Sequence, residues 1–222
     1  QLESYTRPHI EMAVACARSP VGAEAAGKHG IGMLSIGGTS DEALKVHANN
    51  WRVCEESAAN HDQSVDRQNW RLVSLMHVAE TREQARENVK HGLELWAKYF
   101  REVATFPIVP AGIDSAYEYL LENKMACIGT PDDAIEYIEN LLEGAGGFGH
   151  FLELAHNWAD FAQTKRHYEL MARYVRPHFQ HTLEKRKTSY DYSFDNRDVF
   201  VGASSKAVQA EIDRYQAQNK KD

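Results

Sequence analysis

The stretch IEMAVACARSPVGAEAAGKHGIGMLSIGG, residues 10–38, decides the fold class. Its first eight residues, 10–17, are mostly apolar and end before a serine, a proline and a glycine, as a buried parallel strand does where it enters a loop. A short helix is predicted over residues 23–29, and residues 30–38 form a second apolar run with a glycine-rich end. Strand, helix and strand in this order predict a β-α-β unit of a parallel sheet.

The same alternation of strands and helices continues along the chain. Capping residues mark the predicted helix starts, and they are Ser40, Thr81 and Thr130. The further predicted strands cover residues 70–78 (WRLVSLMHV) and 150–158. The further predicted helices cover about residues 40–59, 81–99, 130–143 and 159–175. The core face of the helix after Ser40 carries Leu44, His47, Trp51 and Cys54.

Two regions depart from this rhythm. Residues 100–124 carry two prolines and a glycine, which predict an insertion or an extended loop over one face of the fold. Residues 181–222 are a polar tail, in which one amphipathic stretch, 205–218, predicts a possible helix. We therefore expect one folded region over residues 1–180, followed by the tail.

Composition excludes several classes of protein. The chain has 222 residues and a net charge of −7, and its basic residues are scattered, which argues against a nucleic-acid partner. Its three cysteines lack metal-ligand spacing and fit reduced thiols in a cytoplasmic protein, while no apolar run is long enough to cross a membrane. Because the chain begins with Gln1 and enters a strand almost at once, we expect a processed or truncated end.

Common catalytic motifs are absent from the sequence. It contains no P-loop, HExxH motif or paired-carboxylate motif, so hydrolase and kinase functions have no support. Of its 11 histidines, only His178 and His181 are closely spaced, in the polar tail, and no metal site is predicted. Periodicity alone leaves a (β/α)8 barrel and a doubly wound sheet as alternatives.

Five short stretches of the chain are distinctive as a set: residues 14–20, 25–35, 128–134, 146–149 and 154–160. Together they resemble the bacterial-luciferase-like family of flavin-dependent monooxygenases. Those that resemble the passage from the family's fifth strand to its sixth are residues 14–20 (VACARSP) and 25–35 (AAGKHGIGMLS). Those that resemble the region before and through its eighth strand are residues 128–134 (IGTPDDA), 146–149 (GGFG) and 154–160 (LAHNWAD). Their order and spacing also match, and the resemblance covers roughly residues 8–180.

This resemblance implies a TIM (β/α)8 barrel of which about the last four β/α units are present. It implies a bacterial enzyme that uses reduced FMN, supplied by a separate flavin reductase, and O2 to oxygenate a small organic substrate. One alternative is an F420-dependent oxidoreductase. Another is a non-catalytic flavin-binding half-barrel that pairs with another chain. The family's first four strands have no counterpart here, so we expect the chain to associate with that missing half or with a second copy.

The first predicted strand ends at a candidate phosphate site. Arg18, Ser19 and Gly22 offer a charge, a hydroxyl and backbone N–H groups at the start of a helix. The resemblance implies that this loop holds the FMN phosphate, with Ser19 at the family's serine position. The alternative is that Ser19 and Pro20 only terminate the strand.

The second and third predicted strands end at weaker candidates. Ile36 and Gly37 allow a flat ring system to approach the backbone closely, although a plain glycine turn has the same sequence. His77 lies near the end of the third strand as a candidate catalytic residue. A lone histidine in an apolar run is more commonly a packed core residue.

The fourth predicted strand ends at the sequence His156-Asn157-Trp158. These residues combine a titratable ring, an amide and a large aromatic group where a barrel enzyme places its active site. We predict that His156 is catalytic and that Asn157 and Trp158 contact substrate. The alternative is that Trp158 only seals the last helix while Asn157 caps it.

Overall fold

A computed structural model describes residues 3–7, 10–17, 19–104, 107–182 and 184–219 of the chain. It divides into two compact units, Gln1–Val175 and Arg176–Asp222. Arg18, predicted to bind the flavin phosphate, lies outside the described residues.

The first unit is built on a parallel sheet. Its strands are β1 (Ala13–Cys16), β2 (Gly32–Ile36), β3 (Trp70–Val78), β4 (Ala126–Gly129) and β5 (His150–Glu153). Every pairing between them is parallel. The first unit is therefore the parallel α/β structure that the sequence predicts.

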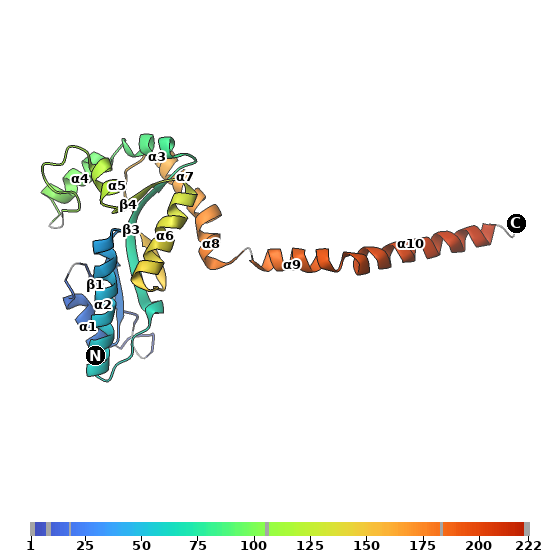
Figure 1. Cartoon of the computed structure of the whole chain (residues 1–222), viewed down its shortest axis with the longest axis horizontal. Helices are drawn as coiled ribbons and strands as arrows, with labels where there is room; N and C mark the ends of the chain where they lie inside the picture. Colours follow the sequence, from blue (N-terminus) through green and yellow to red (C-terminus); the bar gives the residue numbers. More distant parts are fainter. Residues whose placement is uncertain (1–2, 8–9, 18, 105–106, 183, 220–222) are drawn as a thin grey trace. The chain divides into compact units, whose positions relative to one another are not determined.

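The long strand β3 is the centre of the sheet, and it is the teal arrow in Figure 1. Its first half pairs with β2 on one side, with Met33 opposite Trp70, and with β5 on the other, with Arg71 opposite His150. Its second half pairs with β4. β4 lies on the β2 side, because the Thr39 N–H beyond β2 donates to the Lys124 carbonyl just before β4, at 2.8 Å.

Seven α-helices connect and cover the strands of the described first unit. They are α1 (Val21–His29), α2 (Asp41–Asn60), α3 (Arg82–Val89), α4 (Leu93–Glu102), α5 (Ala116–Glu122), α6 (Pro131–Ala145) and α7 (Phe161–Leu170). A 3-10 turn (Arg67–Asn69) precedes β3, and a π-helical turn (Met171–Val175) follows α7. The three predicted caps are confirmed: the side chains of Ser40, Thr81 and Thr130 each accept a hydrogen bond from a first-turn amide.

Two hydrophobic clusters share the sheet. One packs α1 and α2 against β1, β2 and the first half of β3, where Trp51 stacks on Trp70 with ring centroids 5.2 Å apart. The other packs α3, α4 and α5 against the second half of β3 and against β4, with Trp96, Leu120 and Trp158 among its buried members. The halves of β3 thus belong to different cores. Figure 1 shows α1 and α2 beside one end of this strand and α3, α4 and α5 toward the other.

The structure corrects several boundaries. β4 was missed because its four residues lie just after the predicted insertion and are too few to show a period, and the insertion itself contains α5. The predicted helix over residues 81–99 is two helices, α3 and α4. The predicted strand over residues 150–158 ends at Glu153.

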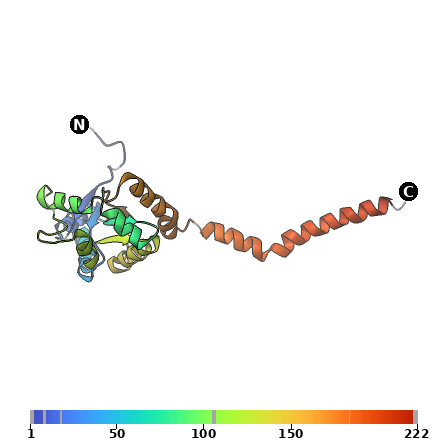
Figure 2. The ribbon, with the colours of Figure 1, turned by 90° about the horizontal axis from the view of Figure 1, so that it is seen from above.

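The second unit consists of helices with no buried residue. They are α8 (Arg176–Gln180), α9 (Glu184–Asp195) and α10 (Arg197–Asn219). Figure 2 shows α9 and α10 as consecutive helices. The predicted helix at 205–218 is therefore only part of α10. Among the described residues, no helix combines the length and apolar character needed to cross a membrane.

Candidate active site

The predicted site residues follow the carboxyl ends of parallel strands. The carboxyl ends of parallel strands are where ligands bind in α/β enzymes. Here β1, β2 and β5 end level with the middle of β3, and β3 continues to Val78 beside β4. We call the described residues after the strands the β1 exit (17 and 19–22), the β2 exit (36–39), the β3 exit (77–80) and the β5 exit (154–158).

The β1 exit is held from both sides. The Ser19 hydroxyl accepts a hydrogen bond from the Val21 N–H at 3.3 Å, and the Asn50 side-chain amide donates to the Ala17 carbonyl at 3.0 Å. A Cβ on Gly22 would lie 2.3 Å from the carbonyl oxygen of Ala15. Only glycine therefore lets α1 start this close to β1, with Ser19 exposed beside its first turn.

The β2 exit packs against a buried histidine. A Cβ on Gly37 would lie 2.4 Å from Nε2 of His47 on α2. Neither ring nitrogen of His47 has a hydrogen-bond partner among the described residues, and burial lowers the pKa of this ring to about 4. Ile36, one residue earlier, is partly exposed. The sequence placed His47 only on the core face of its helix, and nothing there shows that it abuts Gly37.

His77 lies in a buried polar network. Its ring is 1% exposed, its Nε2 accepts a hydrogen bond from the Asn88 side-chain amide at 3.2 Å, and it stacks on His167 with centroids 5.3 Å apart. Asn88 also donates to the Gln163 side chain. Burial, with smaller effects from His167 and His156, lowers the pKa of His77 to about 4. His77 is therefore a neutral ring at pH 7.

Both ring nitrogens of His156 are engaged by the main chain. Nε2 donates to the Met76 carbonyl at 2.8 Å, and Nδ1 accepts from the Trp158 N–H at 3.4 Å. The ring also stacks on Trp158, with centroids 3.9 Å apart and planes 13° from parallel. Burial lowers its pKa to about 4 against the opposing effect of the Met76 bond. To move a proton, this ring would first have to release a main-chain partner.

His167, which the sequence analysis did not single out, has a matching arrangement. Its Nδ1 accepts from the Val78 N–H at 2.9 Å, and its Nε2 donates to the Glu153 carboxylate. His156 and His167 therefore satisfy main-chain groups of β3 beyond the point where β5 ends. No local sequence signal marks His167, because its partners lie 14 and 89 residues away.

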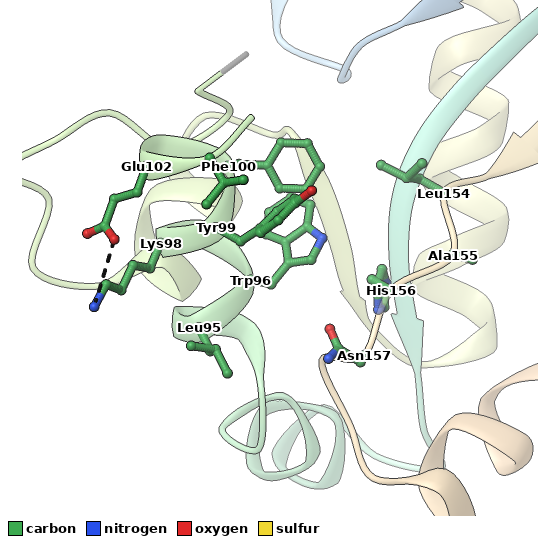
Figure 3. Close-up of a pocket in the computed structure, with 11 residues that line it drawn as sticks. Leu95, Trp96, Lys98, Tyr99, Phe100, Glu102, Leu154, Ala155, His156 and Asn157 are labelled. Carbon is green, nitrogen blue, oxygen red and sulfur yellow. Dashed lines mark ion pairs between the residues drawn. The ribbon is translucent and has the colours of Figure 1, made fainter. Parts of the chain in front are cut away.

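A hollow of about 590 Å³ opens between α4 and the β5 exit (Figure 3). Its lining residues are Leu95, Trp96, Lys98, Tyr99, Phe100, Glu102, Val103, Leu154, Ala155, His156 and Asn157. Two predicted site residues, His156 and Asn157, thus lie together on one wall. Trp158 is fully buried behind His156, and neither it nor His77 lines the hollow.

A parallel sheet with a hollow and glycine-shaped loops at its carboxyl edge is the plan of an α/β ligand-binding protein. A family model described as luciferase-like monooxygenase matches residues 3–148. The chain belongs to the luciferase-like monooxygenase family.

Two curated relatives support this assignment. The chain is 35% identical over 210 residues to limonene 1,2-monooxygenase of Rhodococcus erythropolis, covering 95% of this chain and 54% of that protein. It is 33% identical over 202 residues to 4-hydroxyprotoasukamycin monooxygenase of Streptomyces nodosus subsp. asukaensis, covering 86% and 53%. The chain spans about half the length of both.

Solved structures agree with the fold. The oxygenating constituent of 3,6-diketocamphane monooxygenase from Pseudomonas putida, in complex with FMN, aligns with a TM-score of 0.58 and 25% identity, over 76% of this chain and 49% of that chain. Monooxygenase RslO1 from Streptomyces bottropensis aligns with a TM-score of 0.60 and 20% identity, over 79% and 50%.

Proposed function

We propose that this chain is the second half of a (β/α)8-barrel monooxygenase that uses reduced FMN and O2 to oxygenate a small organic substrate. The observation that carries the proposal is the β1 exit, where a hydroxyl and a helix start meet at the carboxyl edge of the sheet. Bound reduced flavin supplies the electrons that activate O2, and the protein supplies binding and orientation.

We assign the FMN phosphate to the β1 exit. Backbone N–H groups at the start of α1 and the exposed Ser19 hydroxyl suit an anion, and Arg18 adds a positive charge nearby in the sequence. Asn50, which is 1% exposed, holds the Ala17 carbonyl and so fixes the direction of this loop. The loop would therefore be preorganised before the ligand arrives.

The β2 exit is proposed as a wall for the flavin ring. Gly37 carries no side chain, and its backbone is supported from behind by the His47 ring. Its N–H donates to the Val73 carbonyl at 3.3 Å, which ties the exit to β3. Ile36 supplies a partly exposed apolar surface next to it. A flat ring can thus lie against backbone here.

The two predicted catalytic histidines receive positioning roles in this proposal. His156 presents the edge of a substrate wall, beside the exposed amide of Asn157. His77 stacks on His167, and Trp158 packs directly behind His156, so both support that wall from within. We assign proton transfer to neither ring, because both nitrogens of His156 are engaged by the main chain and His77 is buried away from the hollow with its Nε2 bonded to Asn88.

The open sides of the sheet support a partner. In the described residues β1 pairs only with β2, and β5 pairs only with β3, so each leaves one edge free. The relatives are about twice as long as this chain. We propose that the other barrel half, or a second copy, covers these edges, and that a cytoplasmic flavin reductase supplies the reduced cofactor.

Ligand titration tests the proposed function. The chain, alone and combined with the first half of a barrel, is titrated anaerobically with FMN and with F420, following flavin absorbance. Preferential FMN binding, followed by substrate-dependent O2 uptake when reduced FMN is supplied, is the expected result. Tighter binding of F420 would favour the oxidoreductase alternative, and FMN binding without O2 uptake in any combination would favour the non-catalytic half-barrel.

A further inference from the structure

We propose that the hollow between α4 and the β5 exit selects an uncharged, compact, hydrocarbon-rich substrate. This inference rests on the proposed monooxygenase function and adds the substrate class. The volume of about 590 Å³ lies within the range of small-molecule sites, roughly 300 to 1,000 Å³.

The wall on the α4 side is apolar and aromatic. Trp96 and Phe100 contact each other with ring centroids 4.6 Å apart, and Tyr99 meets Phe100 at 5.7 Å. Trp96 also packs edge-on against Trp158 at 5.2 Å, and His156 stacks on the same indole. A continuous series of five rings therefore links α4 to the β5 exit. Figure 3 shows Trp96 and His156 on opposite sides of the hollow.

Charged groups in the lining are directed to each other. Lys98 and Glu102 form an ion pair at 3.9 Å, and their side chains are 57% and 60% exposed. Figure 3 places this pair on the side of α4 away from His156. The remaining polar side chains in the lining are uncharged: the ring of His156, the amide of Asn157 and, on the α4 side, the Tyr99 hydroxyl. A carboxylate or ammonium group inside would lose water without gaining a partner of opposite charge.

The inner wall is packed into the core of the protein. Trp96 is 7% exposed, Trp158 is fully buried, and His156 is held by two hydrogen bonds to the main chain. In contrast, Leu95 and Tyr99 on α4 and Val103 just after it recur every four residues and are 68%, 54% and 67% exposed. The hollow thus has a rigid floor and an uncovered apolar rim, which suits a small apolar molecule that binds in a preformed site.

Binding of two matched ring compounds tests this inference. 1-Methylcyclohexene and cyclohexanecarboxylate are titrated into the full chain without flavin, following tryptophan fluorescence and equilibrium dialysis. The alkene is expected to bind at least about tenfold more tightly than the carboxylate. Equal binding of the two, or no binding of the alkene, would overturn the proposal.

Paired variants locate the binding. Val103→Asp places a charge on the exposed rim and is expected to weaken alkene binding about tenfold or more, whereas Val208→Asp, on exposed α10, is expected to leave it unchanged. Circular dichroism checks that each variant folds, and Leu95→Asp serves as a second rim variant. Alkene binding that neither rim variant weakens would place the site elsewhere. The alkene is titrated without flavin, so the two proposals can fail separately. Alkene binding by a chain that does not bind FMN would refute only the proposed function. FMN binding by a chain that does not bind the alkene would refute only this inference.

Discussion

At the β1 and β2 exits a glycine of the exit itself makes the close contact, with the main chain of Ala15 or with the ring of His47, whereas at the β5 exit large rings fill the space. Gly22 fits against Ala15 and Gly37 against His47 because neither glycine has a side chain. His156 instead covers Trp158 with a parallel ring. The first region brings the main chain close to its neighbours, and the second builds a wall of rings.

The two regions also differ in how their polar groups are satisfied. Beside the β1 and β2 exits, both ring nitrogens of His47 and the Asn50 Oδ1 have no partner among the described residues. Beside the β5 exit, His156 and His167 each use both nitrogens, and the Trp158 Nε1 is the only buried side-chain polar atom of that exit without a partner among the described residues. The presence of a histidine in a candidate motif is therefore a poor guide to chemistry here. In the motif His156-Asn157-Trp158, both ring nitrogens of the histidine are bonded to main-chain groups.

Lowering the pH should have the largest effect on stability. Burial lowers the pKa of His47, His77 and His156 to about 4, from an ordinary value of 6.5. As the pH falls, the unfolded chain takes up these protons before the folded chain does. The contribution of each neutral ring to the free energy of unfolding is therefore fully present above about pH 6.5 and is lost as the pH falls toward about 4. The loss is up to about 3 kcal/mol for each ring. Melting temperature measured from pH 8 to 4 checks this. His77→Gln should make the slope shallower, while His150→Asn, on an exposed histidine, should not. A melting temperature constant between pH 7 and 5 would contradict the burial of these rings.

The close packing at the β1 exit predicts the next largest effect. Gly22→Ala should lower the free energy of unfolding by about 3 kcal/mol, because the new Cβ meets the Ala15 carbonyl and neither backbone can yield cheaply. Urea unfolding measures the loss. Gly202→Ala is the matched control, since nothing lies within 4 Å of a Cβ there. Equal stability of Gly22→Ala and the unaltered protein would show that α1 is not held this close to β1.

His156→Asn tests the β5 wall. Loss of the bond to Met76 and of the stacking should lower the free energy of unfolding by about 1 to 3 kcal/mol. With a full barrel and substrate, KM should rise while kcat per folded molecule stays unchanged. His150→Asn is again the control. A large fall in kcat at constant KM would instead make His156 the catalytic residue that the sequence predicts.

The smallest effect is expected at His47. His47→Leu should leave the free energy of unfolding within about 1 kcal/mol of the unaltered protein, because the ring nitrogens have no protein partner to lose. Thermal unfolding at pH 8, where the unaltered ring is neutral, is the appropriate measurement. A loss above about 2 kcal/mol would reveal an ordered water or ligand on this ring and would erase the contrast between the two regions.

The sequence predicted features that depend on neighbouring residues. The caps at Ser40, Thr81 and Thr130 were found because a cap and its amides lie within three residues. The break between α3 and α4 was missed because it depends on a distant contact: a Cβ on Gly92 would lie 2.1 Å from the Asn157 carbonyl.

The same reason limits prediction of the candidate site. The sequence located the ends of β1, β2 and β3, since each follows an apolar run, but it extended β5 to residue 158 and missed β4. It could not assign the state of His156, because the Met76 carbonyl that occupies its Nε2 is 80 residues away in the chain. The sequence also did not reveal β4. This strand is defined by its pairing with the second half of β3, and its four residues are too few to show a periodic pattern.

The measurement that tests the central claim most directly compares FMN with riboflavin, which differ by the phosphate. Ser19→Ala combined with Arg18→Ala should weaken FMN binding about tenfold or more, since bonds to a charged group are lost, and should leave riboflavin binding nearly unchanged. Ser204→Ala, exposed on α10, should affect neither ligand. Equal losses for FMN and riboflavin would place the phosphate away from the β1 exit and contradict the assignment of this edge as the flavin site.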